Sequence, residues 1–285
     1  MGGRLVGVRR EARDALAAAN LRPRKRWGQH FLCDPGVVRR IVDLAVVADE
    51  PAVLEIGPGL GALTDALAAC ARRLYLIEID RGLAARLEAR YAGQAHVRVI
   101  TGDVLELPLD AMIDAPRAIV VGNLPYNITT PILFRLLDLR HRFPRAVLMV
   151  QREVATRLAA RPGGKDWGVL PALIQTFADV RLAFRVPARS FLPPPRVESA
   201  VVTVHWSATP RVDVDDVEAY RAVIRAAFGQ RRKTLRNSLG ALAVARGLDA
   251  PALLDAFSRA GIDPGTRAER LSTADFARLA RAIGH

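Results

Sequence analysis

The stretch that decides the fold is VLEIGPGLGALT, residues 53–64. It begins with apolar residues typical of a buried strand, passes through the glycine-rich turn GPGLG (57–61) and enters an amphipathic helical pattern that runs to residue 71. Glycines between a strand and a helix let a ligand approach the backbone closely. The stretch therefore predicts the start of an α/β sheet, with a ligand site at the carboxyl end of its first strand.

Strand patterns of the same kind recur along the chain, with helical patterns between them. Apolar runs occupy 73–80, 97–103, 118–123 and 145–151, and an alternating run occupies 197–206. Apolar strands separated by amphipathic helices are typical of a parallel sheet buried on both faces. We expect a Rossmann-like α/β sheet with an antiparallel strand near one edge.

The composition changes at SATPRVDVDD, residues 207–216, and everything after it has helical patterns. Ser272, with Asp275 three residues later, predicts the N-terminal cap of the last helix. We expect three parts: a basic N-terminal segment (1–26), the α/β catalytic domain (27–208) and a small all-helical C-terminal domain (209–285).

Two acids follow predicted strands at the edge where ligands of open α/β sheets bind. Glu78 ends the strand after the glycine-rich turn, where a carboxylate can accept hydrogen bonds from both ribose hydroxyls of a nucleoside. Asp103 ends the next strand and can accept from an exocyclic adenine amine. The turn, with Gly57 and Gly59, is GxGxG rather than the dinucleotide GxGxxG, and Pro58 has no N–H for a pyrophosphate. This favours S-adenosylmethionine over a nicotinamide dinucleotide.

The fourth predicted strand runs into Asn123-Leu124-Pro125-Tyr126, a motif that resembles the acceptor site of amino-methyltransferases. An adenine amine is a poor nucleophile because its lone pair is delocalised into the ring. The side-chain oxygen of Asn123 and the backbone carbonyl of Leu124 can orient that amine, Pro125 stiffens the turn, and the Tyr126 ring can stack on the base. Such catalysis rests on positioning, with the cofactor supplying the activated methyl group, and requires no metal.

Phe191 precedes the proline run 193–195. The sequence leaves two interpretations open, since a phenylalanine held by prolines can close a base pocket or anchor the core at a rigid corner.

The charge indicates a polyanionic partner. The chain carries a formal net charge of +13, which is typical of nucleic-acid binding, although an arginine-rich proteome is the alternative explanation. The basic residues are concentrated in two clusters, and the second has no acid between Glu218 and Asp249. We expect both clusters to bind RNA phosphates: Arg22, Arg24, Lys25 and Arg26 in the first, and Arg221, Arg225, Arg231, Arg232, Lys233 and Arg236 in the second.

The remaining features exclude several classes of protein. The sequence has no apolar run of roughly 20 residues that could span a bilayer and no hydrophobic signal segment. Cys33 and Cys70 lie far apart, and the five histidines show no metal-ligand spacing. We therefore expect a cytoplasmic protein without a disulfide framework and without a metal site.

Taken in order, the motifs resemble the small-subunit rRNA adenine N6,N6-dimethyltransferases of the KsgA type, from about residue 22 to residue 282. The segments that carry the resemblance are RKRWGQHFL (24–32), VLEIGPGLGALT (53–64), IEIDRGLAARL (77–87), GDVLEL (102–107), VVGNLPYNITTPILF (120–134), VQREVATRLAARPGGKDWG (150–168), FLPPPRVESAVV (191–202), FGQRRKTLRNSL (228–239) and RAERLS (267–272).

The resemblance implies a target of two adjacent adenines in a hairpin near the 3′ end of small-subunit rRNA, within a pre-30S particle, and we expect a monomer. It implies an acceptor site formed by Asn123, Leu124, Pro125 and Tyr126, with Phe191 as a second stacking ring. The chain departs from the family at Trp167-Gly168-Val169-Leu170-Pro171, where Tyr-Gly is more common, so residues 165–171 receive no role. The resemblance also implies S-adenosylmethionine contacts at His30 (often Asn in the family), Leu32, Gly57, Glu78, Asp103 and Asn123.

Two other functions remain as alternatives. The large-subunit rRNA methyltransferases of the macrolide-resistance type share the first half of the chain. They usually have Ile where Leu124 stands and lack QRRKTLRNSL (230–239). The other alternative is a non-catalytic ribosome-assembly factor, which would not need the intact glycine-rich turn, Glu78, Asp103 and the Asn-Leu-Pro-Tyr motif.

Overall fold

The computed structural model describes residues 13, 14, 17, 29–45, 52–230 and 232–284. The chain divides into two compact units. The first comprises Met1–Ala155 and Val180–Trp206, and the second comprises Thr156–Asp179 and Ser207–His285. The division at Trp206 lies beside the predicted boundary at 208, whereas Thr156–Asp179 belongs to the second unit although it lies within the predicted catalytic range.

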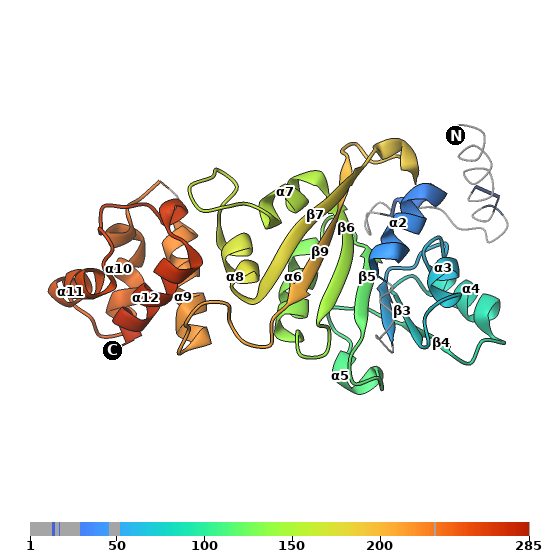
Figure 1. Cartoon of the computed structure of the whole chain (residues 1–285), viewed down its shortest axis with the longest axis horizontal. Coiled ribbons are helices and arrows are strands. Elements are labelled where there is room, and N and C mark those ends of the chain that lie inside the picture. Colours follow the sequence, from blue (N-terminus) through green and yellow to red (C-terminus); the bar gives the residue numbers. More distant parts are fainter. Residues whose placement is uncertain (1–12, 15–16, 18–28, 46–51, 231, 285) are drawn as a thin grey trace. The chain divides into compact units, whose positions relative to one another are not determined.

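A seven-stranded sheet forms the centre of the first unit (Figure 1). Strands β2 to β6 are parallel, and β9 pairs antiparallel with β6, so the predicted Rossmann-like fold class is confirmed. In order across the sheet the strands are β4 (Val97–Thr101), β3 (Leu74–Glu78), β2 (Val53–Ile56), β5 (Ile119–Asn123), β6 (Arg145–Gln151), β9 (Ser199–Trp206) and β7 (Ala178–Val186).

Strand β7 is an edge strand that the sequence patterns did not predict. Its residues are mostly half-buried or exposed, and it carries Asp179, Arg181 and Arg185. Charged side chains are common on edge strands, where they oppose pairing with other chains, but they hide the apolar pattern that identifies a strand.

The central strands are mostly apolar because helices cover both faces of the sheet. Every residue of β2 and β3 is buried. One face packs its Val53, Leu74 and Val121 against apolar residues from α2, α3 and α4 in a single core cluster. The helices of this unit are α2 (Pro35–Ala45), α3 (Thr64–Ala68), α4 (Arg81–Tyr91), α5 (Leu109–Met112), α6 (Thr129–Asp138) and α7 (Arg152–Leu158), whose last residues belong to the second unit.

A two-stranded sheet joins segments that are distant in sequence. Strand β1 (Phe31–Leu32) pairs antiparallel with β8 (Phe191–Leu192), with Leu32 opposite Phe191. The short helix η2 (Ala188–Ser190) precedes β8, and Cys33 donates its N–H to the Ser190 carbonyl at 2.8 Å. This pairing brings the residues before β1 to the carboxyl edge of the main sheet.

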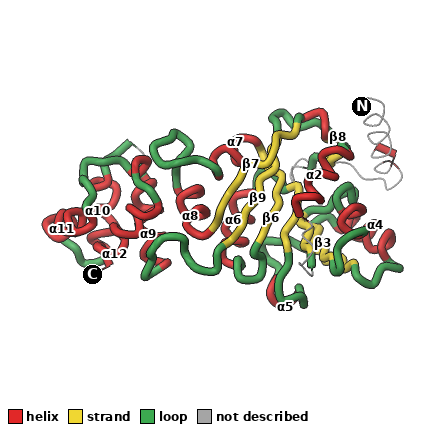
Figure 2. Tube along the Cα trace, viewed as in Figure 1, coloured by secondary structure: helices red, strands yellow, loops and turns green. Residues whose placement is uncertain are grey.

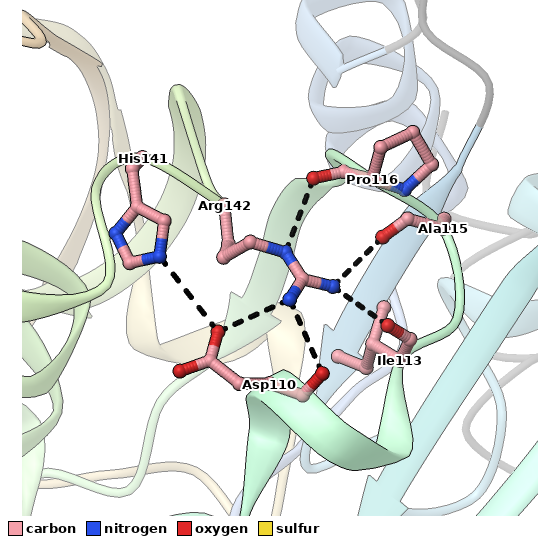
Figure 3. A network of polar contacts seen from close by, with 6 residues as sticks. All are labelled: Asp110, Ile113, Ala115, Pro116, His141 and Arg142. Atoms are coloured by element: carbon pink, nitrogen blue, oxygen red, sulfur yellow. Dashed lines mark hydrogen bonds and ion pairs between the residues drawn. The ribbon is translucent and has the colours of Figure 1, made fainter.

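One arginine holds the connection between α5 and β5 (Figure 3). Arg142 donates to the backbone carbonyls of Asp110, Ile113, Ala115 and Pro116 at 2.7–3.1 Å, and to the Asp110 carboxylate at 3.2 Å. The bonds to the Ile113 and Ala115 carbonyls are partly buried, where a backbone acceptor needs a partner. Arg142 thereby ties the end of α5 to the segment that leads into β5.

The second unit contains helices and loops, shown in red and green in Figure 2. Asp216 caps α9 and Asp249 caps α11 through their carboxylates. The predicted cap at Ser272 is confirmed, because Asp275 N–H donates to Ser272 Oγ and Ser272 N–H donates to the Asp275 carboxylate. Its helices are α8 (Val169–Phe177), α9 (Val217–Gly229), α10 (Leu235–Ala245), α11 (Ala250–Ala260), η3 (Ala268–Arg270) and α12 (Thr273–Gly284).

The segment where the sequence departs from the family that it resembles contributes Trp167 to this unit's core. Trp167 is fully buried, and its Nε1 donates to the Leu271 carbonyl at 2.9 Å. Gly163 N–H donates to the Glu269 carbonyl at 2.7 Å, so the loop before α8 is fastened to the loop before α12. Trp167 therefore has a packing role, and the exposed Gly163 contributes a backbone hydrogen bond.

Candidate active site

A cleft at the carboxyl ends of β2, β3, β4 and β5 collects the predicted cofactor and acceptor residues. Each predicted cofactor residue lines it, and so do Leu124, Pro125 and Tyr126. The lining comprises Gln29, His30, Phe31, Leu32, Glu55, Ile56, Gly57, Pro58, Gly59, Leu60, Ala62, Leu63, Ile77, Glu78, Ile79, Gly102, Asp103, Val104, Asn123, Leu124, Pro125, Tyr126 and Ile128.

The glycine-rich turn forms the floor of this cleft. Gly57 and Gly59 have φ of 68° and 59°, a region that side-chain-bearing residues rarely adopt. A Cβ on Gly59 would lie 3.1 Å from the Phe31 ring, closer than the packing allows without movement. The turn thus keeps bare backbone facing the cleft, which suits a ligand that needs close approach.

Glu78 is buried at the end of β3 and is held by backbone donors. Its Oε2 accepts from Gly59 N–H at 3.0 Å, and its Oε1 accepts from Asp80 N–H at 2.9 Å. Burial raises the pKa of Glu78, and these two hydrogen bonds oppose that rise. Each carboxylate oxygen has further lone pairs, so the side chain can also accept from a pair of ribose hydroxyls.

Asp103 lies after β4 in a turn that its own carboxylate stabilises. Its Oδ1 accepts from Leu105 N–H at 2.8 Å. Arg135 of α6 donates to the Leu105 carbonyl at 2.7 Å and also to the Leu107 carbonyl. A side chain from the helix that follows the acceptor motif therefore holds the turn that presents Asp103.

The amide of Asn123 has a defined orientation. Its Nδ2 donates to the His30 backbone carbonyl at 2.8 Å, which leaves Oδ1 as the atom that can accept from a ligand. The backbone of the motif is tied to the sheet, since Leu124 N–H donates to the Met149 carbonyl at 3.0 Å. An amide oxygen held in this way is a group that can accept from an amine.

Tyr126 is fixed by contacts at its hydroxyl and at its ring. Its hydroxyl shares a hydrogen bond of 2.7 Å with Ser199 Oγ, and burial raises its pKa. One ring face stacks on His30 with centroids 5.8 Å apart. His30 Nδ1 in turn donates to the Pro193 carbonyl at 2.8 Å, because a carbonyl can only accept. His30 therefore joins the acceptor motif to the proline corner.

Phe191 does not line the cleft. Its ring is fully buried in the core cluster, beneath the β1–β8 pair. The structure favours the second of the two interpretations, a core anchor at a rigid corner. A stacking role would require the ring to leave a packed environment, at the cost of its apolar burial.

The second basic cluster lies on α9 and the segment that follows it. Arg225, Arg232, Lys233 and Arg236 are exposed. Arg221 is different, because its side chain is only 15% exposed and pairs with Glu218 at 3.4 Å, so it is less available to phosphate. Arg22, Arg24, Lys25, Arg26 and Arg231 lie outside the described residues.

Several residues of the cleft were not predicted from the sequence, and three of them bear on its chemistry. Glu55 of β2 is buried in the lining, and Ile79 and Val104 are the apolar residues that directly follow Glu78 and Asp103. Ile79 is 38% exposed although it is a large apolar side chain, as expected for a surface that contacts a flat base. The available signals were an acid inside an apolar strand and an apolar residue after each strand-end acid.

Metal ligands and membrane spans can be assessed for the part of the chain that the structure describes. Within it, no group of three or more histidine, cysteine or acidic side chains is placed to hold a metal ion. No helix in the described ranges has the length and apolar character needed to cross a membrane.

Known proteins resemble this chain over nearly its whole length. A curated relative from Syntrophotalea carbinolica, "Ribosomal RNA small subunit methyltransferase A", is 50% identical over 93% of this chain and 98% of its own. A dimethyladenosine transferase from Plasmodium falciparum superposes with a TM-score of 0.73 at 26% identity, covering 88% of this chain and 96% of its own. The 23S rRNA methyltransferase ErmE superposes with a TM-score of 0.67 at 26% identity, covering 90% of this chain and 100% of its own.

The family model described as "Ribosomal RNA adenine dimethylase" matches residues 20–284. Its match includes the glycine-rich turn, both strand-end acids, the Asn123 motif and the helical second unit. The chain belongs to the ribosomal RNA adenine dimethylase family.

Proposed function

We propose that this protein transfers methyl groups from S-adenosylmethionine to N6 of two adjacent adenines near the 3′ end of small-subunit rRNA, forming N6,N6-dimethyladenosine. The observation that carries the proposal is the convergence of Glu78, Asp103 and Asn123, from three strands, on one cleft. The name of the relative at 50% identity supports the small subunit as the source of the rRNA.

The cofactor fits the residues of the cleft. Asp103 would accept from the adenine amine between the apolar Ile79 and Val104, and Glu78 would accept from the ribose. The bare turn at Gly57 and Gly59 admits the remainder of the molecule. His30 and Leu32 would close the cleft from β1, where both are held by the pairing with β8. When bound, the cofactor supplies a methyl group already activated by its sulfonium.

The acceptor motif would position the adenine amine. Asn123 Oδ1 and the Leu124 carbonyl would accept its two N–H groups, which points the nitrogen lone pair at the methyl group. Tyr126 would stack on the base through the ring face that His30 does not cover. For the second methylation only one N–H is left, so one of the two acceptors must tolerate a methyl group beside it.

RNA binding would rest on contacts to the sugar-phosphate backbone of the RNA. The exposed Arg225, Arg232, Lys233 and Arg236 present donors to phosphates without reading sequence. A pre-30S particle is the proposed substrate, because a hairpin in the small subunit is accessible before assembly is complete, and the protein is proposed to act as a monomer. Cytoplasmic localisation follows from that substrate.

The two alternatives are less well supported. A large-subunit target, as in the name of ErmE, rests on a fold relative at 26% identity, whereas the small-subunit relative is 50% identical. A role in assembly without catalysis does not require the oriented amide of Asn123 or the paired donors on Glu78. An assembly role in addition to catalysis is compatible with the oriented Asn123 amide and with the donors on Glu78.

The proposal is tested by mass spectrometry of rRNA from a strain that lacks the protein. Supplying the wild-type protein should restore dimethyladenosine in small-subunit rRNA. In single-turnover assays, Asn123→Ala should slow transfer with RNA affinity nearly unchanged, because phosphate contacts dominate affinity. Tyr126→Ala should weaken productive capture of the base, since stacking contributes about 1–3 kcal/mol.

The control for these assays is Asn127→Ala, an exposed asparagine of the same loop that does not line the cleft. It should transfer methyl groups at the wild-type rate. Transfer by Asn123→Ala at that same rate would contradict the acceptor role, and restored methylation confined to large-subunit rRNA would favour the alternative target.

A further inference from the structure

The cleft contains a buried carboxyl that the proposed chemistry does not use. Glu55 of β2 is 1% exposed and lies in the cleft lining, two residues before Gly57. Its Oε2 accepts from Thr64 Oγ1 at 2.7 Å. Among the described residues no lysine, arginine or histidine pairs with it, although a buried carboxylate is ordinarily paired.

The groups around Glu55 favour its uncharged form. Glu78 on β3 and Asp65 on α3 are both acidic, and only the Thr64 hydroxyl stabilises the ionised form. From α4, Tyr91 donates to Asp65, and Arg90 pairs with Asp65 rather than with Glu55. Burial is the largest influence and raises the pKa of Glu55 to about 8.

The remaining titratable groups of the cleft are His30, before β1, and Asp103, after β4. Neither is hydrogen-bonded to Glu55, and β5 contributes the uncharged Asn123. Burial without a basic partner among the described residues therefore favours the protonated carboxyl in the protein alone.

The order of the strands indicates which part of the cofactor lies over Glu55. Across the sheet the order is β4, β3, β2, β5. Asp103 follows β4, Glu78 ends β3 and Asn123 ends β5, so the adenine, the ribose and the methyl acceptor occupy that sequence of positions. In S-adenosylmethionine the sulfonium joins the ribose to the transferable methyl group. With the proposed contacts at Glu78 and Asn123, it would lie between these residues, over β2, the strand that carries Glu55.

We propose that Glu55 distinguishes the charged methyl donor from its uncharged product, by releasing its proton to solvent when the sulfonium binds and so placing a carboxylate beside the positive charge. This inference rests on the proposed cofactor site. A charge pair in a partly dehydrated cleft interacts more strongly than in water. S-adenosylhomocysteine is a neutral thioether, so it leaves Glu55 protonated. After transfer the carboxyl takes a proton back, and the attraction that held the donor is absent for the product.

The sign of the pH dependence follows from the proton that must leave. Affinity for S-adenosylmethionine should rise with pH up to about 8, the value above which Glu55 is already ionised in the free protein. The slope reaches at most about tenfold per pH unit, corresponding to one proton released. Affinity for S-adenosylhomocysteine should lack this component, so the preference for the donor should grow between pH 6 and pH 8.

The test is isothermal titration calorimetry of the full chain with each ligand at pH 6, 7 and 8, in two buffers of different ionisation enthalpy. The two buffers give the number of protons released on binding. Wild-type protein should release more protons with S-adenosylmethionine than with S-adenosylhomocysteine at pH 7. Glu55→Gln keeps an oxygen that accepts from Thr64 but has no proton to lose. It should therefore release fewer protons than the wild type when S-adenosylmethionine binds.

The free ligands' own amino groups titrate identically in wild type and Glu55→Gln, so the comparison between the two proteins removes their contribution. Thr64→Val is a second variant: it removes the hydrogen bond that favours the carboxylate and should move the pH response upward. Equal proton release for both ligands in the wild type, or unchanged release in Glu55→Gln, would overturn the inference. The number of protons that the wild-type protein releases with each ligand tests the inference even if a variant fails to fold. Failure of the wild type to bind either ligand would instead contradict the proposed function.

Discussion

At the residue scale, single side chains of the cleft stabilise the surrounding backbone and also keep acceptor oxygens for the proposed ligand. Glu78 illustrates this, because its carboxylate accepts from Gly59 and Asp80 before any ribose is present. Asn123 is likewise held before any ligand is present, because its Nδ2 donates to the His30 carbonyl. Groups whose orientation is already fixed lose little conformational entropy when a ligand binds, which raises affinity.

Replacement of Glu78 tests this dual role. A hydrogen bond to a charged group contributes about 1.5–3 kcal/mol, so Glu78→Ala should weaken S-adenosylmethionine binding by about 10–150-fold. Calorimetry measures the affinity, and circular dichroism checks that the fold is retained. Glu88→Ala removes an exposed carboxylate from the neighbouring helix α4 and should leave the affinity unchanged. Unchanged affinity in Glu78→Ala would show that this carboxylate does not hold the ribose.

At the element scale, helix α6 links the two halves of the cleft. It follows the Asn123 motif, and its Arg135 holds the carbonyls of Leu105 and Leu107 in the turn after Asp103. The turn that presents Asp103 and the loop that carries Asn123, the proposed adenine contact and the proposed methyl-acceptor site, are therefore connected through one helix.

Arg135→Met tests the coupling, because it keeps the apolar stem and removes both hydrogen bonds. Stability should fall by about 1.5–3 kcal/mol. Affinity for S-adenosylmethionine should also fall, by about tenfold for each 1.4 kcal/mol of binding energy removed, since Asp103 is no longer held. Thermal unfolding and calorimetry give the two quantities.

Arg142→Met is the matched control for that variant. It also removes carbonyl bonds, but from residues 110–116, which do not line the cleft (Figure 3). It should lower stability without a comparable reduction in affinity. Equal reductions in affinity in the two variants would show that Arg135 acts through general stability alone.

At the scale of the whole molecule, cofactor and RNA contacts are assigned to different units. The cleft lies within the first unit, and the exposed Arg232, Lys233 and Arg236 lie in the second. The segment that carries them is fastened to residues 264–266, since Leu235 N–H donates to the Thr266 carbonyl at 2.8 Å.

Replacing Arg232, Lys233 and Arg236 together by glutamine should lower RNA affinity and flatten its salt dependence. The slope should fall by about 0.7–0.9 log units for each phosphate that is no longer neutralised, and cofactor affinity should not change. Filter binding over a series of salt concentrations measures the slope. The same substitution at Arg259, Arg278 and Arg281, which pair with acids, removes equal charge and should alter the slope little. A slope unaltered by the first triple variant would exclude these residues from the RNA interface.

Much of the fold is predictable because its signals are local. The parallel strands, the glycine-rich turn and the acids at the strand ends are visible as apolar runs and spacings within a few residues. Strand β7 was not predicted because an edge strand carries charged side chains. The packing role of Trp167 was not predicted because its partner Leu271 lies far along the chain.

Local patterns of residues are enough to predict the α/β class, the order of the strand-end residues Glu78, Asp103 and Asn123, and the basic character of the second unit. The contacts of those residues depend on the folded chain. The pairing of β1 with β8 puts His30 on Tyr126 and Phe191 in the core, and the helices over β2 leave Glu55 buried without a basic partner among the described residues. Burial and long-range pairing depend on residues distant in the chain, which no local pattern contains.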